Sequence, residues 1–130
     1  MTRQQLENLD FLYRAFRDLC LSGKLTDGLV GAFHRVLDHI GVPNSYEYME
    51  GFFAETKEAA RNALGDKIPL DFLDFDLAPD ISTNIDIEDA YACIWQAAQR
   101  SQAGTLAAIR LSMIRSLGED RQRVLIGQWV

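Results

Sequence analysis

The chain has 130 residues, of which 48% are apolar and 25% are charged, and its formal net charge at pH 7 is −6. This length and composition are typical of one ordinary globular domain, so we expect residues 1–130 to form a single helical domain without a disulfide or metal staple. The acidic balance argues against direct binding to nucleic acid or to an anionic membrane, and it favours a protein partner with a basic surface.

Five segments show the three- and four-residue spacing of apolar side chains that is typical of helices. Thr26 is a good N-cap for the second of them. Glycine tolerates the left-handed conformation that ends helices, so we expect stops at Gly23, Gly41, Gly65, Gly104 and Gly118. The sequence therefore predicts an all-α fold, a compact bundle of five or six helices, over about residues 4–22, 26–40, 44–64, 82–102 and 105–117.

The fifth segment and the tail that follows it are less regular than the first four segments. The helix predicted from Thr105 is apolar on most sides, so we expect it to be the most buried. The tail, residues 119–130, begins with a helical pattern, but its end, VLIGQWV, could finish a helix or form a short strand. Trp129 either folds back on the core or contributes to a homodimer contact.

The two cysteines, Cys20 and Cys93, lie among apolar residues at helical spacing, which favours buried, reduced thiols. The N-terminal residues lack the pattern of a signal peptide, and no stretch approaches the ~18 apolar residues that a membrane span needs. We expect a cytoplasmic protein, in the host cytoplasm if it is encoded by a phage.

One long crossover loop is predicted over residues 66–83, before the fourth helix. Between Lys67 and Arg100 the chain has seven carboxylates and no positive charge, so the rest of the chain sums to +1. Apolar side chains alternate with the aspartates of the loop, and we expect them to hold it against the bundle. The predicted partner-binding residues are Asp71, Phe72, Asp74, Phe75, Asp76, Asp80, Asp86, Glu88 and Asp89.

Two other interpretations of the acidic segment stay open. Asp74, Asp76 and Asp80 have part of the spacing of a calcium loop, but Pro79 and Ile85 stand where an EF-hand needs Gly and Glu. The carboxylates near the start of the fourth helix are also favoured by the helix dipole, and those of the loop could be a solvated face without a partner.

The sequence shows no catalytic or cofactor motif, so we expect no enzyme, no cofactor and no metal. His34 and His39 are five residues apart and diverge on a helix, unlike the paired histidines of zinc helices. His34 and Asp38 are four apart and could touch. A helix-turn-helix around residues 36–49 would present glutamates to the phosphates, which disfavours it.

The five arginines after residue 99 either face the acidic segment within the fold or form a separate basic face. If the acidic segment is free, it can imitate a phosphate backbone and occupy a basic groove. The leading hypothesis is a non-enzymatic inhibitor of a macromolecular partner, of the immunity or anti-defence type. The alternative is a helical adaptor or assembly subunit that acts through homo-oligomerisation.

Overall fold

The computed structural model describes residues 1–64 and 84–129, and this part of the chain contains helices and no strand. The predicted all-α class is therefore confirmed. In chain order the helices are α1 (Arg3–Leu21), α2 (Asp27–Ile40), α3 (Ser45–Leu64), α5 (Ile87–Ala98), α6 (Ala103–Leu117) and α7 (Glu119–Trp129). The predicted crossover, residues 66–83, lies outside the described residues.

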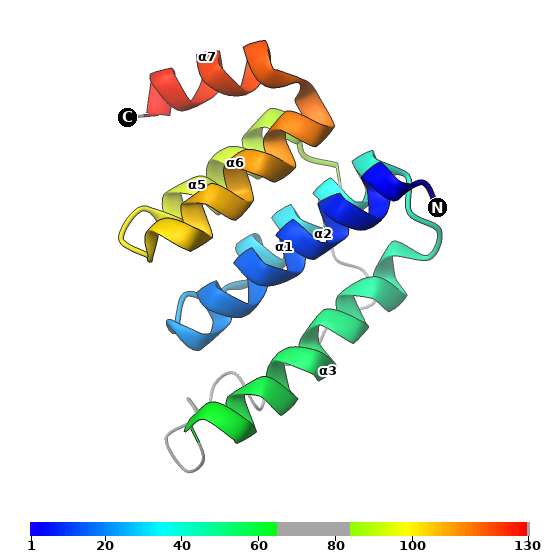
Figure 1. Ribbon diagram of the computed structural model, residues 1–130, viewed down its shortest axis with the longest axis vertical. Helices are drawn as coiled ribbons and strands as arrows, with labels where there is room; N and C mark the ends of the chain where they lie inside the picture. The colour runs from blue at the N-terminus through cyan, green and yellow to red at the C-terminus, as the bar shows by residue number, and fades with distance from the viewer. Residues whose placement is uncertain (65–83, 130) are drawn as a thin grey trace.

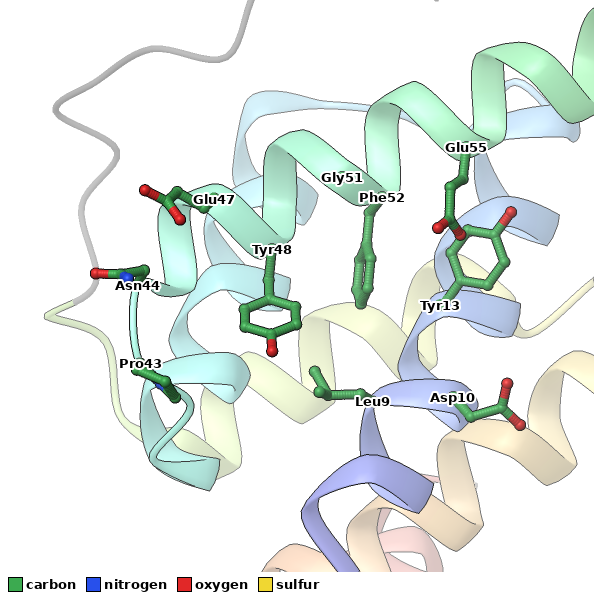
Figure 2. Close-up of a pocket in the computed structure, with 10 residues that line it drawn as sticks. All are labelled: Leu9, Asp10, Tyr13, Pro43, Asn44, Glu47, Tyr48, Gly51, Phe52 and Glu55. Atoms are coloured by element: carbon green, nitrogen blue, oxygen red, sulfur yellow. The ribbon is translucent and has the colours of Figure 1, made fainter. Parts of the chain in front are cut away.

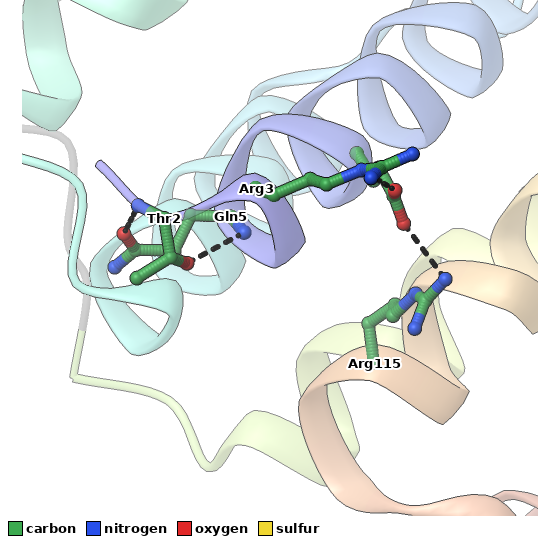
Figure 3. A network of polar contacts seen from close by, with 5 residues as sticks. Thr2, Arg3, Gln5 and Arg115 are labelled. Atoms are coloured by element: carbon green, nitrogen blue, oxygen red, sulfur yellow. Dashed lines mark hydrogen bonds and ion pairs between the residues drawn. The ribbon is translucent and has the colours of Figure 1, made fainter.

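Helices α1, α2 and α5 begin at side-chain caps. Thr2 and Gln5 form a capping box, in which the Thr2 backbone N–H donates to Gln5 Oε1 (2.8 Å) and the Gln5 N–H donates to Thr2 Oγ1 (3.1 Å), as Figure 3 shows. Thr26 caps α2 as predicted, and Asp86 caps α5. Such caps satisfy backbone donors that have no partner inside the helix.

The six helices form four successive layers (Figure 1). The two central layers are the pairs α1–α2 and α5–α6, and they face each other so that α1 packs on α6 and α2 packs on α5. Helix α3 covers the outer side of the α1–α2 pair, and α7 follows α6 at the opposite end. Because α3 is an outer layer, its far side faces away from the rest of the described structure.

Phe16 of α1 joins the first three helices. Its ring lies edge-on to Phe33 of α2 (5.3 Å between centroids) and to Phe53 of α3 (5.1 Å). Edge-to-face packing of this kind is favourable beyond the area that it buries. Buried side chains from all six described helices belong to one continuous hydrophobic core.

A buried polar network joins α1, α5 and α6. Ser112 Oγ donates to Asn8 Oδ1 (2.5 Å), and Asn8 Nδ2 donates to Ser116 Oγ (2.9 Å). The Tyr91 hydroxyl lies 2.7 Å from Ser116 Oγ and 2.9 Å from Ser112 Oγ. Burial raises the pKa of Tyr91 to about 12, against the smaller lowering effect of these two hydrogen bonds. Each of the four side chains therefore has a partner, as buried polar groups require.

Several boundaries differ from the prediction. Helix α5 begins at Ile87 rather than near residue 83, because the carboxylate of Asp86 caps the backbone N–H of Glu88 (2.8 Å). It ends at Ala98, and α6 begins at Ala103, so Gly104 lies inside the first turn of α6 and is not a stop. By contrast, Gly23, Gly41 and Gly118 have positive φ, as predicted for helix ends.

Helix α6 is not the most buried helix. Leu111 on α6 is 44% exposed, whereas seven of the fourteen residues of α2 are buried. The prediction was wrong because apolar residues on all sides of a helix do not say how many sides have neighbours. The tail is helical, as α7. Its Leu125 and Ile126 are buried, and Trp129 packs on Trp95 of α5 with 6.4 Å between ring centroids.

Candidate functional site

Most of the predicted acidic surface lies outside the described residues. Six of the nine predicted residues fall outside the described ranges, namely Asp71, Phe72, Asp74, Phe75, Asp76 and Asp80. Of the three that are described, Asp86 caps α5, Glu88 pairs with an arginine, and Asp89 is exposed. Two of these three carboxylates therefore have a role inside the fold, and the prediction that the nine residues form one partner-binding surface stays a prediction.

The arginine that forms an ion pair with Glu88 is Arg121 of α7. Its Nε and Nη2 donate to the two carboxylate oxygens at 2.6 and 2.5 Å, which is a bidentate pair. The hydrogen bond from Arg121 lowers the pKa of Glu88, and the opposite charge adds to this effect. Other C-terminal arginines also have partners in the molecule: Arg115 pairs with Glu7 (2.7 Å; Figure 3), and Arg123 pairs with Glu119 (3.4 Å).

An open cavity between α1 and α3 has a volume of about 580 Å³. We call it the α1–α3 groove (Figure 2). Three of its lining residues come from α1, two from the turn before α3, and five from α3. They are Leu9, Asp10, Tyr13, Pro43, Asn44, Glu47, Tyr48, Gly51, Phe52 and Glu55.

The floor of the groove is apolar and aromatic. Leu9 and Phe52 are both 7% exposed, so each presents only an edge to the cavity. The rings of Tyr13 and Phe52 are 5.6 Å apart between centroids, which joins α1 to α3 below the groove. Tyr48 is half-buried and extends from α3 toward α1 (Figure 2), with its hydroxyl 3.7 Å from Met1 Sδ.

The rim of the groove is acidic. Glu47, Gly51 and Glu55 are spaced by four and follow one row along α3, so a glycine separates two exposed glutamates. On the α1 side Asp10 pairs with Arg14 (3.1 Å), and both side chains are more than half exposed. None of the described residues that line the groove is a lysine or an arginine. None of the ion pairs found among residues 1–64 and 84–129 involves α3.

A histidine, a serine and an aspartate meet where α2 is followed by α3. Ser45 Oγ donates to Asp38 Oδ1 (2.5 Å) and lies 2.9 Å from His34 Nε2, so Ser45 links the two residues that were expected to touch. A serine nucleophile needs its proton to go to the imidazole, with the carboxylate behind the imidazole. Here the serine hydroxyl donates to the carboxylate, and His34 Nδ1 is buried with no hydrogen-bond partner among the described residues. The contact between His34, Ser45 and Asp38 therefore holds α2 to the start of α3 and does not have the geometry of a catalytic triad.

The remaining reactive groups give no second site. Both cysteines are free; burial raises the pKa of Cys20 to about 12 and also raises the pKa of the half-buried Cys93. Within the two described ranges, no group of three or more His, Cys, Asp or Glu side chains is placed to hold a metal ion. Among the same residues, no helix is long and apolar enough to cross a membrane.

Comparisons with known proteins do not add a functional assignment. No family model matches the chain, and searches of curated proteins and of solved structures gave no significant match.

The groove was not predicted from the sequence, although part of its signal is present there. In the sequence, the helical spacing over residues 44–64 places Glu47 and Glu55 on the outer face of the third predicted helix and Phe52 on its inner face. Both placements agree with the structure, and Gly51 lies between the two glutamates on the same face of the helix. The contribution of Leu9, Asp10 and Tyr13 depends on α3 lying beside α1, which no local pattern indicates.

Proposed function

We propose that this chain is a non-enzymatic binding protein that inhibits a macromolecular partner by covering a basic surface of that partner. The observation that carries the proposal is the exposed negative charge of Glu47 and Glu55 on helix α3, which form no ion pair with described residues. Glu47 and Glu55 rim an aromatic cavity whose described lining contains no basic side chain, and α3 has no ion pair among the described residues.

Charge of this kind acts mainly on partner choice and on the rate of association. Aromatic side chains beside it supply the apolar contact in which binding energy concentrates. Phe52, Tyr48 and Tyr13 are such side chains. An immunity or anti-defence protein that competes with a nucleic acid for a basic groove is the class that this combination fits best. The aspartates predicted in the crossover would extend the acidic surface.

The test begins with capture of a partner from the native host by the full chain, followed by measurement of its affinity at increasing salt. We expect the affinity to fall steeply with salt, because exposed charges are screened. Asp74→Lys with Asp76→Lys should weaken binding at least tenfold more than the matched reversal of Glu50 and Glu58 on α3, which lie outside the groove lining.

An affinity that does not change with salt would contradict the electrostatic basis of the proposal. Equal losses from both double reversals would remove the crossover from the interface. Light scattering of the unliganded chain separates this function from assembly: a stable homo-oligomer that is lost when residues 125–130 are deleted would favour the adaptor alternative. The burial of Leu125 and Ile126 within the chain gives that alternative no support.

A further inference from the structure

We infer that the α1–α3 groove binds an extended segment of a basic protein in which two arginine or lysine side chains flank one large apolar side chain. The pattern is cation–x–apolar–x–cation, where x is any residue. This inference rests on the proposed function and names the contact by which a basic partner is recognised. It depends on the spacing of the two rim glutamates, on the floor between them and on Gly51.

The spacing of the acidic side chains fits an extended chain. Glu47 and Glu55 are eight residues apart on one helix, so their Cα atoms are about 12 Å apart. Residues i and i+4 of an extended strand are about 13 Å apart and lie on the same face as residue i+2. Two cations at i and i+4 can therefore meet the two glutamates while the side chain at i+2 enters the groove.

The floor provides the contact for that central side chain. Phe52 and Leu9 are nearly buried, and the half-buried Tyr48 extends over the cavity. A large aliphatic side chain placed between them would lose most of its contact with water, which is the main source of affinity in such sites. The charged ends then fix direction and register.

The third observation is that a glycine, Gly51, stands inside helix α3 between the two rim glutamates. Glycine inside a helix is destabilising relative to alanine, so its presence needs a reason. A Cβ at Gly51 would meet no atom within 4 Å, and the residue has no positive φ. Neither the packing nor the backbone of the described chain therefore requires a glycine there. A glycine there permits close approach of another backbone between Glu47 and Glu55.

The experiment uses the full chain and three labelled, end-blocked pentapeptides, which are too short to form helices in water. The first is Arg-Ala-Leu-Ala-Arg, the second replaces Leu with Ser, and the third has the same composition with adjacent arginines, Arg-Arg-Ala-Leu-Ala. Fluorescence anisotropy measures their binding at low salt. We expect saturable binding of the first peptide and at least threefold weaker binding of the other two.

Two pairs of variants locate the site. Glu47→Gln with Glu55→Gln should weaken the first peptide about fivefold, since exposed ion pairs are individually weak, and Glu50→Gln with Glu58→Gln should have no more than a twofold effect. Gly51→Leu should abolish binding by filling the groove. Gly51→Ala should raise the midpoint of thermal unfolding and still weaken binding, whereas Gly127→Ala on α7 should leave binding unchanged.

Equal binding of the three peptides, or equal losses from both glutamine pairs, would mean non-specific charge attraction and would overturn the inference. Absence of saturable binding to the first peptide would overturn it as well. The outcome is separable from that of the proposed function. If a captured basic partner still binds with salt dependence to the Glu47→Gln and Glu55→Gln variant, the groove inference fails and the inhibitor function stands.

Discussion

Replacing Tyr91 with phenylalanine tests the buried polar network with a single deleted atom. The ring of Tyr91 is fully buried, so the variant keeps its packing. The lost hydroxyl contacts Ser116 Oγ at 2.7 Å and Ser112 Oγ at 2.9 Å. Both serines keep a hydrogen bond to Asn8, so neither hydroxyl is left without a partner.

The size of the effect follows from this accounting. A buried hydrogen bond contributes about 1 kcal/mol net, and a large desolvation penalty arises only when a partner is orphaned. Tyr91→Phe should therefore lower the free energy of unfolding at pH 7 by about 1–2 kcal/mol. For a chain of this length, that corresponds to a decrease of roughly 4–7 °C in Tm.

The same variant has a distinct dependence on pH. The pKa of Tyr91 is about 12 in the folded chain and about 10 in the unfolded chain. The unfolded chain releases this proton at lower pH, so the stabilisation is complete below pH 10 and is lost as the pH rises to 12. A shift of two pKa units corresponds to about 2–3 kcal/mol. Because phenylalanine does not titrate, the variant should lose less stability than the wild type above pH 10.

Urea unfolding followed by circular dichroism, at pH 7 and in steps from pH 9 to 11.5, measures both effects. Burial of Cys20 adds an alkaline loss that is common to both proteins and cancels in their difference. Tyr48→Phe is the matched control, since among the described residues its hydroxyl has only a weak sulfur contact. A loss below 0.5 kcal/mol at pH 7 would refute the network argument. Parallel stability curves for Tyr91→Phe and wild type above pH 10 would refute the raised pKa.

Two further predictions concern single side chains. At pH 8 a maleimide should modify the native protein at Cys93, which is half-buried, and spare Cys20, whose pKa is raised to about 12. Mass spectrometry counts the labels. Modification of both thiols without unfolding would contradict the burial of Cys20. In an NMR titration, Glu88 should have a pKa below that of a free glutamate, and Arg121→Gln should raise it toward the ordinary value. An unchanged pKa would show that the pair does not persist in solution.

Local sequence signals predicted most helix ends. Thr26 begins α2, and Gly41 and Gly118 follow helices with positive φ, because caps and stops depend on one or two residues. Gly104 misled the prediction because the preceding helix had already ended at Ala98. The start of α5 was placed too early because Ser82, Asn84 and Asp86 are all good caps, and only tertiary structure selects among them.

The candidate site was less predictable. Charge counting located an acidic segment, but it could not tell that Glu88 meets Arg121 of α7, since that contact joins residues far apart in sequence. It gave no signal for Glu47 and Glu55, which lie outside that segment. Those glutamates become part of a groove only because α1 brings Tyr13 and Leu9 alongside α3. Pairwise helix packing is not encoded in any one segment.

The described acidic residues near α5 and those on α3 are therefore not equivalent, although their charges are the same. Reversing Glu88 would place two positive charges at a contact between α5 and α7, so a loss of function there could arise from a disturbed fold. Glu47 and Glu55 are exposed and form no ion pair with described residues, and surface substitutions of this kind usually change stability by less than about 0.5 kcal/mol. A loss of binding caused by changes on α3 can consequently be attributed to the interface, which makes the α1–α3 groove the place where the electrostatic hypothesis can be rejected most directly.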